Sequence, residues 1–221
     1  MEPIKRLVLV PTSGWNKANE CPDVEGDKRI EAAASAIESC LVNPETLTKI
    51  AFVGGYPDRN GDTLAGKYKR YYVKKYQSQF NQRYPNLIEE RYGDFRQTVA
   101  FISDKSNCTV KDFSDKRLID KVDKFFGIDE GSKELRPAFL VFIPTSYLHF
   151  LKAAMALGKF GYKGIFANSK EPVGWKRWLK ESTQFVYAIY DPLWNRYIGR
   201  KLAKMADNKA KNYWQSSKTP G

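Results

Sequence analysis

Four short apolar segments constrain the fold of this chain more than any other feature. They are rich in Val, Ile and Phe and lie next to turn residues such as Pro and Gly: Leu7–Val10, Ile50–Val53, Phe139–Ile143 and Ile165–Ala167. Continuous apolarity, rather than alternation, is typical of strands that are buried on both faces, as in a parallel sheet. The sequence therefore predicts a mainly parallel sheet that contains these four segments.

Between these segments, apolar residues recur at helical spacing. One stripe runs from Ile30 to Leu41, a second from Leu64 to Tyr76, and a third from Leu118 to Phe126, for which Ser114 is the predicted N-cap. Strand and helix in alternation predict an α/β domain with helices on both faces of the sheet. Residues 95–103 fit a strand or a helix equally well and do not fix the topology.

The C-terminal part has helical patterns of its own, over residues 175–189 and 194–205. We expect one domain over residues 1–206, which includes this helical extension, and a basic tail over 207–221. From Arg196 onward there are seven basic residues and one acidic residue, so this end carries half of the net charge of +12. Such a segment is either a solvated end or a contact for anionic membrane or nucleic acid.

Cysteine usage and hydropathy exclude several classes of protein. The three cysteines have no Cys-x-x-Cys spacing, which argues against a disulfide framework and a zinc cluster and favours a reducing compartment. The longest apolar run, 138–143, is too short to span a bilayer, and Leu7–Val10 is too short for the core of a signal peptide. The sequence predicts a cytoplasmic location and leaves the oligomeric state open.

The sharpest local feature is the junction at residues 143–154, where an apolar strand ends in a turn that opens a helix. Tyr147, Leu148, Leu151, Ala154 and Met155 are expected to face the core, which leaves a second face for His149, Lys152, Ala153 and Ala156. His149 and Lys152 would then lie near the helix N-terminus, where backbone N–H groups attract phosphate or carboxylate. His149, the single histidine of the chain, is either a ligand contact or a structural histidine.

Two further turns follow predicted strands and end at the same edge of the sheet. Gly54-Gly55 permits either close approach of a ligand or a turn with positive φ, and Ser13-Gly14 offers hydroxyl and N–H donors. Because the carboxyl ends of parallel strands meet in one crevice, we expect these turns to join the His149 junction in one site. The sequence contains no nucleotide-binding glycine motif, no serine-hydrolase elbow and no second histidine for a metal pair.

The order of these motifs resembles the YdcF-like proteins, domain-of-unknown-function family 218, which include SanA and ElyC. Thr145-Ser146-x-x-His149-x-x-Lys152-Ala153 is similar to the family pattern Thr-Ser-x-x-His-x-x-Arg-Ala, with Lys for Arg. Val53-Gly54-Gly55 resembles the family's strand and Ser-Gly-Gly turn, and Arg29 stands where the family has an arginine on its first helix. Leu64 replaces the acid of the family's Ser-Glu-Ala segment.

The resemblance implies a Rossmann-like domain with a ligand crevice at the carboxyl edge of the sheet. It implies an anionic or nucleotide-type ligand, with S-adenosylmethionine or a phosphorylated envelope precursor as candidates and a link to cell-envelope integrity. Whether the protein is an enzyme stays open; if it is, His149 is the candidate acid or base. The implied ligand-binding residues are Ser13, Gly14, Arg29, Gly54, Gly55, Thr145, Ser146 and Lys152. The alternative is a basic module that contacts nucleic acid or membrane through its C-terminus.

Overall fold

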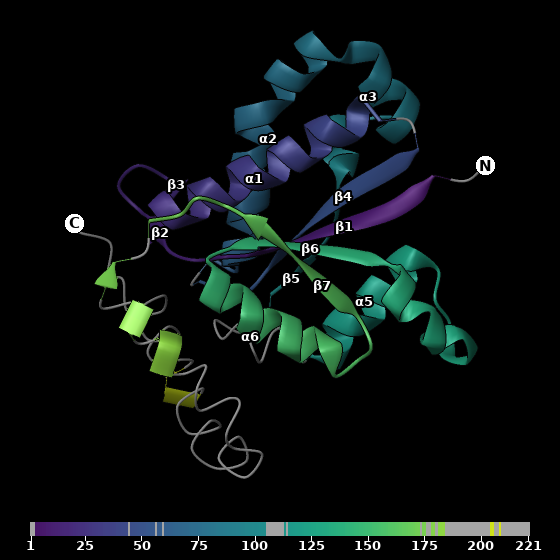
Figure 1. Cartoon of the computed structure of the whole chain (residues 1–221). Helices are drawn as coiled ribbons and strands as arrows, with labels where there is room; N and C mark the ends of the chain where they lie inside the picture. Colours follow the sequence, from purple (N-terminus) through teal and green to yellow (C-terminus); the bar gives the residue numbers. More distant parts are fainter. Residues whose placement is uncertain are drawn as a thin grey trace.

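Five parallel strands form the main sheet, in the order β5-β4-β1-β6-β7 (Figure 1). The computed structural model describes residues 3–43, 45–55, 57–58, 60–104, 113, 115–172, 174–175, 178–179, 181–183, 204–205 and 208. The strands are β1 (Ile4–Pro11), β4 (Thr46–Val53), β5 (Val99–Ser103), β6 (Leu140–Thr145) and β7 (Lys163–Asn168). Two short strands, β2 (Trp15–Asn16) and β3 (Cys21–Pro22), pair as an antiparallel hairpin in the loop after β1.

All four predicted strand segments lie in this sheet and run parallel. β1 is central: it pairs with β4 from Ile4 opposite Thr46 to Pro11 opposite Val53, and with β6 on its other side. β7 pairs with β6 and forms one edge. The ambiguous segment 95–103 divides into a short 3-10 helix, η1 (Phe95–Thr98), and the other edge strand, β5. The predicted three-layer α/β fold is confirmed.

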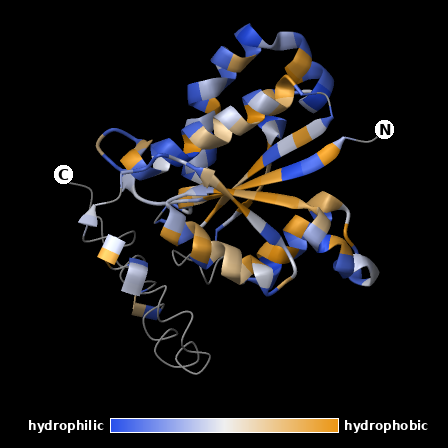
Figure 2. Cartoon of the chain, viewed as in Figure 1, coloured by the Kyte–Doolittle hydropathy of each residue, from blue (hydrophilic) through white to orange (hydrophobic). Residues whose placement is uncertain are grey.

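Helices cover both faces of the sheet, as Figure 1 shows. One face packs against α1 (Val24–Leu41), α2 (Leu64–Arg83) and α3 (Pro85–Tyr92), and the other against α5 (Lys116–Phe126) and α6 (Tyr147–Gly158). A 3-10 segment, η2 (Glu130–Ala138), leads into β6. Successive side chains of β1 point to opposite faces of the sheet. Val8 and Val10 belong to the first core, on the side of α1 and α2, and Leu7 and Leu9 belong to the second core, on the side of α5 and α6. In Figure 2, orange hydrophobic residues gather in β1 and β6 at the centre of the molecule.

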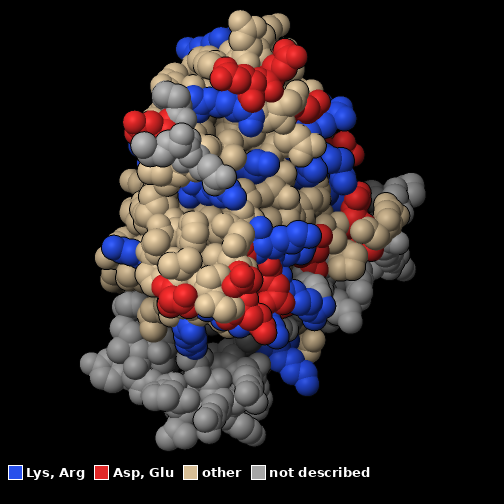
Figure 3. Space-filling view, turned by 90° about the vertical axis from the view of Figure 1, so that its right-hand side faces the viewer, with Lys and Arg blue, Asp and Glu red and all other residues tan. Residues whose placement is uncertain are grey.

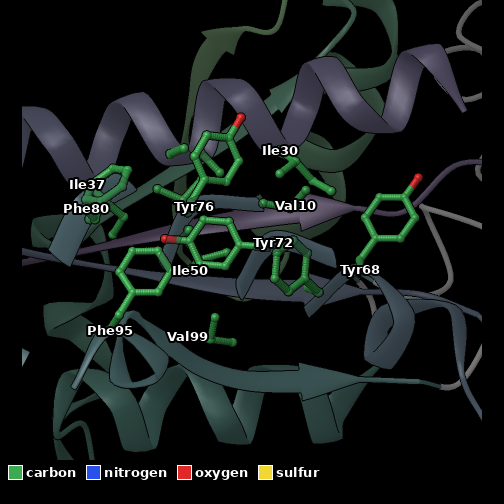
Figure 4. Close-up of a cluster of buried hydrophobic side chains, with 14 of the residues drawn as sticks. Val10, Ile30, Ile37, Ile50, Tyr68, Tyr72, Tyr76, Phe80, Phe95 and Val99 are labelled. Carbon is green, nitrogen blue, oxygen red and sulfur yellow. The ribbon is translucent and has the colours of Figure 1, made fainter. Parts of the chain in front are cut away.

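Aromatic side chains on α2 fill the first core (Figure 4). Tyr68, Tyr72, Tyr76 and Phe80 follow one another at a spacing of four residues, so they share one face of the helix. Phe95 from η1 closes this column, with its ring centroid 5.2 Å from those of Tyr72 and Phe80. The predicted stripe is therefore a core feature, as its spacing indicated.

Two local predictions for the helices need correction. Ser114 lies outside the described residues, and the N-cap of α5 is Asp115, whose carboxylate accepts a hydrogen bond from the N–H of Arg117 at 2.8 Å. On α6 the predicted faces are reversed: Lys152, Ala153, Ala156 and Leu157 are buried, while Tyr147 and Met155 are 59% and 41% exposed. Ala154 keeps its predicted orientation toward the sheet, since a Cβ added at Gly164 of β7 would lie 3.1 Å from that of Ala154.

The C-terminal predictions fall largely outside the described residues. Trp175, Trp178, Leu179 and residues 181–183 are helical, as are Lys204, Met205 and Asn208. The rest of 184–221, which carries most of the predicted basic segment, lies outside the described part of the chain. The division into a domain over 1–206 and a tail over 207–221 stays a prediction.

Replacing Phe95 by Ala should lower the free energy of unfolding by about 3 to 5 kcal/mol, because it leaves a cavity beside Tyr72 and Phe80. Leu135→Ala is the control: this side chain is 51% exposed, and its loss should change stability by no more than about 0.5 kcal/mol. Denaturant unfolding followed by circular dichroism measures both. Equal effects of the two substitutions would contradict the assignment of Phe95 to the core.

Candidate functional site

The candidate site lies where the chain turns in opposite directions from two neighbouring strands. β1 leads to α1 on one face of the sheet, and β6, which pairs with β1, leads to α6 on the other face. In open parallel sheets, ligands bind at the carboxyl ends of such a strand pair, because the two outgoing loops separate there. Pro11 and Thr145 end the two strands, so the predicted Ser13-Gly14 turn and the His149 junction both belong to this point.

A carboxylate of the protein itself occupies the centre of this edge. Glu171 Oε2 accepts from Arg29 Nε at 2.7 Å, and Oε1 accepts from Arg29 Nη2 at 3.2 Å and from the Ser146 N–H at 2.8 Å. The Thr145 hydroxyl lies 3.5 Å from Oε1. The Arg29 and Glu171 side chains are each 1% exposed. We call the donors Arg29, Thr145 and Ser146 the Arg29 site; it is a buried binding site for one carboxylate.

Local structure explains why each donor of the Arg29 site points to the same place. Arg29 lies on the face of α1 that packs on the sheet, and its Nη1 donates to the carbonyl oxygen of Pro11 at 2.8 Å. Ser146 is the N-cap of α6, and its side chain does not cap the helix, so its own N–H is directed at Glu171. The Ser146 hydroxyl instead donates to Glu181 at 3.2 Å.

His149 lies beside the Arg29 site, in the first turn of α6. Its Nδ1 is 2.9 Å from the Thr145 hydroxyl oxygen and 3.4 Å from Arg29 Nη2. A guanidinium can only donate hydrogen bonds, so Nδ1 is the acceptor of the contact with Arg29, and the single proton of the Thr145 hydroxyl goes either to Nδ1 or to Glu171 Oε1. His149 thus joins the residues that the sequence predicted at this junction, and contacts from two elements orient it.

The turn after β1 forms a second polar cluster, which the sequence did not identify. Asp23, the N-cap of α1, accepts from the Ser13 hydroxyl at 2.5 Å, from the Gly14 N–H at 2.9 Å and from the Gly26 N–H at 2.8 Å. The Tyr68 hydroxyl accepts from the Ser13 N–H at 3.1 Å, and burial raises the pKa of this phenol. Ser13 and Gly14 are thus held by protein groups, and a side chain at Gly14 would collide with Asp23.

The backbone conformation of the Gly54-Gly55 turn requires glycine, which is one of the two alternatives that the sequence left open. Both glycines have positive φ, 110° and 102°. The Gly54 N–H donates to the carbonyl of Ser103 at 2.7 Å, and its carbonyl accepts from the N–H of Ala65 at 3.2 Å. A Cβ at Gly55 would lie 2.4 Å from that of Leu64. The turn therefore lets α2 start directly against the carboxyl edge of the sheet.

Lys152 does not project from the exposed face of α6 as expected. It is 9% exposed and lies with Ala153 and Ala156 on the buried side of the helix. Replacing Lys152 by Ala is therefore expected to change stability as well as any binding of an anion.

Asp104 is a further acidic group at this edge, immediately after β5. Burial raises the pKa of its carboxyl, while a hydrogen bond from the Thr63 hydroxyl and the charge of Lys121 oppose that rise. Its Oδ1 is buried, and no hydrogen-bond partner lies at that oxygen in the described structure. No sequence motif marked Asp104, although its place after a strand was a usable signal.

Several charged groups elsewhere in the described residues are paired within the protein. A hollow of about 600 Å³ between α5 and η2 contains Asp123, which accepts from Arg136 and from the Tyr162 hydroxyl at 2.5 Å. Figure 3, which views the side of the molecule where β1 begins, shows basic and acidic residues interspersed. Among the residues described, no group of three His, Cys, Asp or Glu side chains is placed to hold a metal ion. Within the same residues, no helix has the length and apolarity needed to cross a membrane.

Comparison with known proteins adds no relative: no family model, no curated protein and no solved structure matches this chain. The resemblance to the YdcF-like family stays a prediction from the motifs.

Gly55→Ala should lower the free energy of unfolding by at least about 3 kcal/mol, because a methyl group meets Leu64 and the backbone keeps a positive φ. Gly61→Ala is the matched control. Gly61 has φ +79° and nothing within 4 Å of an added Cβ, so only the backbone cost of about 1 to 2 kcal/mol applies. Equal losses in denaturant unfolding would show that the contact with Leu64 does not limit this position.

Asp104→Asn should stabilise the protein near neutral pH. Because folding raises the pKa of Asp104, the wild-type protein loses stability as the pH rises from the ordinary Asp value through the folded-state value. The asparagine variant lacks this loss, so its advantage should be largest above the folded-state pKa and shrink as the pH falls toward the ordinary value. The difference in stability is measured from the urea midpoints of both proteins at pH values between 4 and 8, in steps of about one pH unit. An advantage that is independent of pH would contradict the assignment.

Proposed function

We propose that this protein binds a small anionic or nucleotide-type ligand at the carboxyl edge of its sheet, with the acidic group of the ligand at the Arg29 site. One observation carries the proposal: donors from α1, the end of β6 and the start of α6 converge there on a single carboxylate, that of Glu171. Such a site needs a buried guanidinium and a helix N-terminal N–H aimed at the same point, and it lies where parallel sheets of this kind take their ligands.

The strength of the contacts suits an acidic group. A hydrogen bond to a charged partner contributes about 1.5 to 3 kcal/mol, and Arg29 offers two nitrogens to the same carboxylate. S-adenosylmethionine would present its carboxylate, and a nucleotide or a phosphorylated envelope precursor would present a phosphate. The sequence resemblance suggested these candidates, and no comparison supports one over another.

His149 is the group best placed to act on a ligand bound at the Arg29 site. It is the single histidine of the chain, and Thr145 and Arg29 fix its ring through Nδ1. We assign it the role of a donor to the ligand or, if a reaction occurs, of an acid or base, because its ordinary pKa lies near neutrality. Thr145 and Arg29 then act as positioning residues for the ring.

The first test is a thermal-shift screen of the wild-type protein with nucleotides, sugar phosphates and S-adenosylmethionine. A ligand present at 100 times its dissociation constant should stabilise the protein by about 2.7 kcal/mol. If no anionic ligand in the panel raises the melting temperature above that in sodium chloride of equal ionic strength, the proposed function is wrong.

His149→Gln then separates the roles of the ring, since glutamine keeps hydrogen-bonding capacity but cannot titrate. Affinity for the best ligand of the screen should fall about 10-fold if His149 donates to the ligand. If turnover is found, a lost rate with unchanged affinity identifies acid or base chemistry. A variant that is less stable but binds and reacts like the wild type would leave His149 with a structural role only.

A further inference from the structure

The chain after β7 crosses the end of the sheet and supplies the anion that fills the Arg29 site. Residues 169–172 follow the last residue of β7, Asn168, and run toward the start of α1 (Figure 1). Ser169 and Glu171 are buried, whereas Lys170 and Pro172 are exposed. This segment thus lies over the edge of the sheet with alternate side chains directed into it.

We propose that Glu171 is an intramolecular ligand, so that an external carboxylate reaches the Arg29 site only when residues 169–172 move away. The inference rests on the proposed function and adds to it both a regulatory element and a ligand class. Oε2 accepts from Arg29 Nε, and Oε1 accepts from Arg29 Nη2 and the Ser146 N–H. Two coplanar oxygens match this set of donors, so the class of ligand is one that carries a carboxylate.

The donors do not depend on segment 169–172 for their positions. Arg29 is anchored on α1 and bonded to the Pro11 carbonyl, and Ser146 is fixed as the first residue of α6. An external carboxylate that replaced Glu171 would therefore meet a formed site. Such an exchange also keeps a close partner for the buried guanidinium, whereas a simple departure of Glu171 would leave it, among the described residues, only the partly exposed Glu25, 4.0 Å from Nη2.

The backbone of the segment favours its release. Lys170 has φ +52°, in the left-handed region that non-glycine residues rarely occupy, and this turn brings Glu171 onto Arg29. The strain disappears when the segment leaves, while the contacts of Arg29 and Ser146 pass to the new carboxylate. The wild-type protein should therefore bind external carboxylates with an affinity reduced by the fraction of molecules in which the segment is displaced.

The test compares acetate binding by four proteins: wild type, Glu171→Ala, Glu171→Gln and the double variant Arg29→Gln/Glu171→Gln. Melting temperature is followed against sodium acetate and sodium phosphate, with sodium chloride of equal ionic strength as the baseline. Glu171→Ala should show a saturable rise with acetate, with a dissociation constant at least about 10-fold lower than that of the wild type. The double variant should show no response beyond that to chloride.

Glu171→Gln provides the same test if the alanine substitution prevents folding. Glu171→Gln retains the shape, loses the charge and replaces one acceptor oxygen with an NH2 donor, so it should fold and bind acetate at least about 3-fold more tightly than the wild type. Equal acetate affinity in the wild type and the Glu171 variants, or a response that persists in the double variant, would overturn the proposal. Tighter binding of phosphate than of acetate by the Glu171 variants would overturn the assignment to carboxylates.

The acetate experiment and the ligand screen can fail independently, so they distinguish the intramolecular ligand from the proposed function. Acetate binding by the Glu171 variants, together with a wild-type protein that binds no anionic ligand in the screen, would support the intramolecular ligand and reject the proposed function. A screen ligand that binds the wild type and the Glu171 variants with equal affinity would do the reverse.

Discussion

The ion pair between Arg29 and Glu171 holds together the part of the structure where function is expected. Both side chains are almost fully buried, and either charge without the other would be costly: breaking such a pair typically destabilises a protein by about 3 to 5 kcal/mol. Arg29 also binds the end of β1, and Glu171 also binds the start of α6. The pair therefore joins α1, the two central strands and the segment after β7 at one point, and it fixes His149 through Arg29.

The two helices that follow the central strands, α1 and α6, both have a carboxylate of the chain at their N-terminus. The N-terminus of α1 is occupied by Asp23 and that of α6 by Glu171, so each group of unpaired N–H donors meets a carboxylate of the chain. In nucleotide-binding proteins with a parallel sheet, a glycine-rich turn leaves such donors to a phosphate. Here the glycines serve close packing instead, since Gly14 lies against Asp23 and Gly26 against Tyr68.

The sequence predicted the layers of the fold but not the centre of the site. Two-sided burial leaves a continuous apolar run, so β1, β4 and β6 could be located without a structure, and the edge strand β7 was found from a similar run although its residues are only partly buried. The edge strand β5 is only partly buried over residues 100–102, and its pattern stayed ambiguous. The faces of α6 were reversed because the helix is apolar around most of its circumference, and periodicity cannot show that small residues face the sheet.

The candidate residues that could be predicted lie at the ends of regular elements, and the one that could not lies in an irregular segment. Thr145, Ser146 and His149 come together because a strand end and the first turn of the next helix have fixed places in a parallel sheet, and Arg29, which was named only through the family resemblance, joins them from α1. Glu171 could not be found in this way, because it lies in an irregular segment with no motif. Its partner is 142 positions earlier in the chain, and only the tertiary fold brings the two together.

This separation along the sequence has a consequence for biosynthesis. At usual rates of translation, Arg29 leaves the ribosome roughly ten to thirty seconds before Glu171. β1 also lacks its neighbour β6 during most of this interval, since β6 begins at Leu140. Until residue 171 has emerged, the described part of the nascent chain offers Arg29 only Glu25, whose carboxylate lies 4.0 Å from Nη2 in the finished fold, so the guanidinium gains its closest counter-ion late. The carboxyl edge of the sheet is completed only when nearly the whole domain has been made.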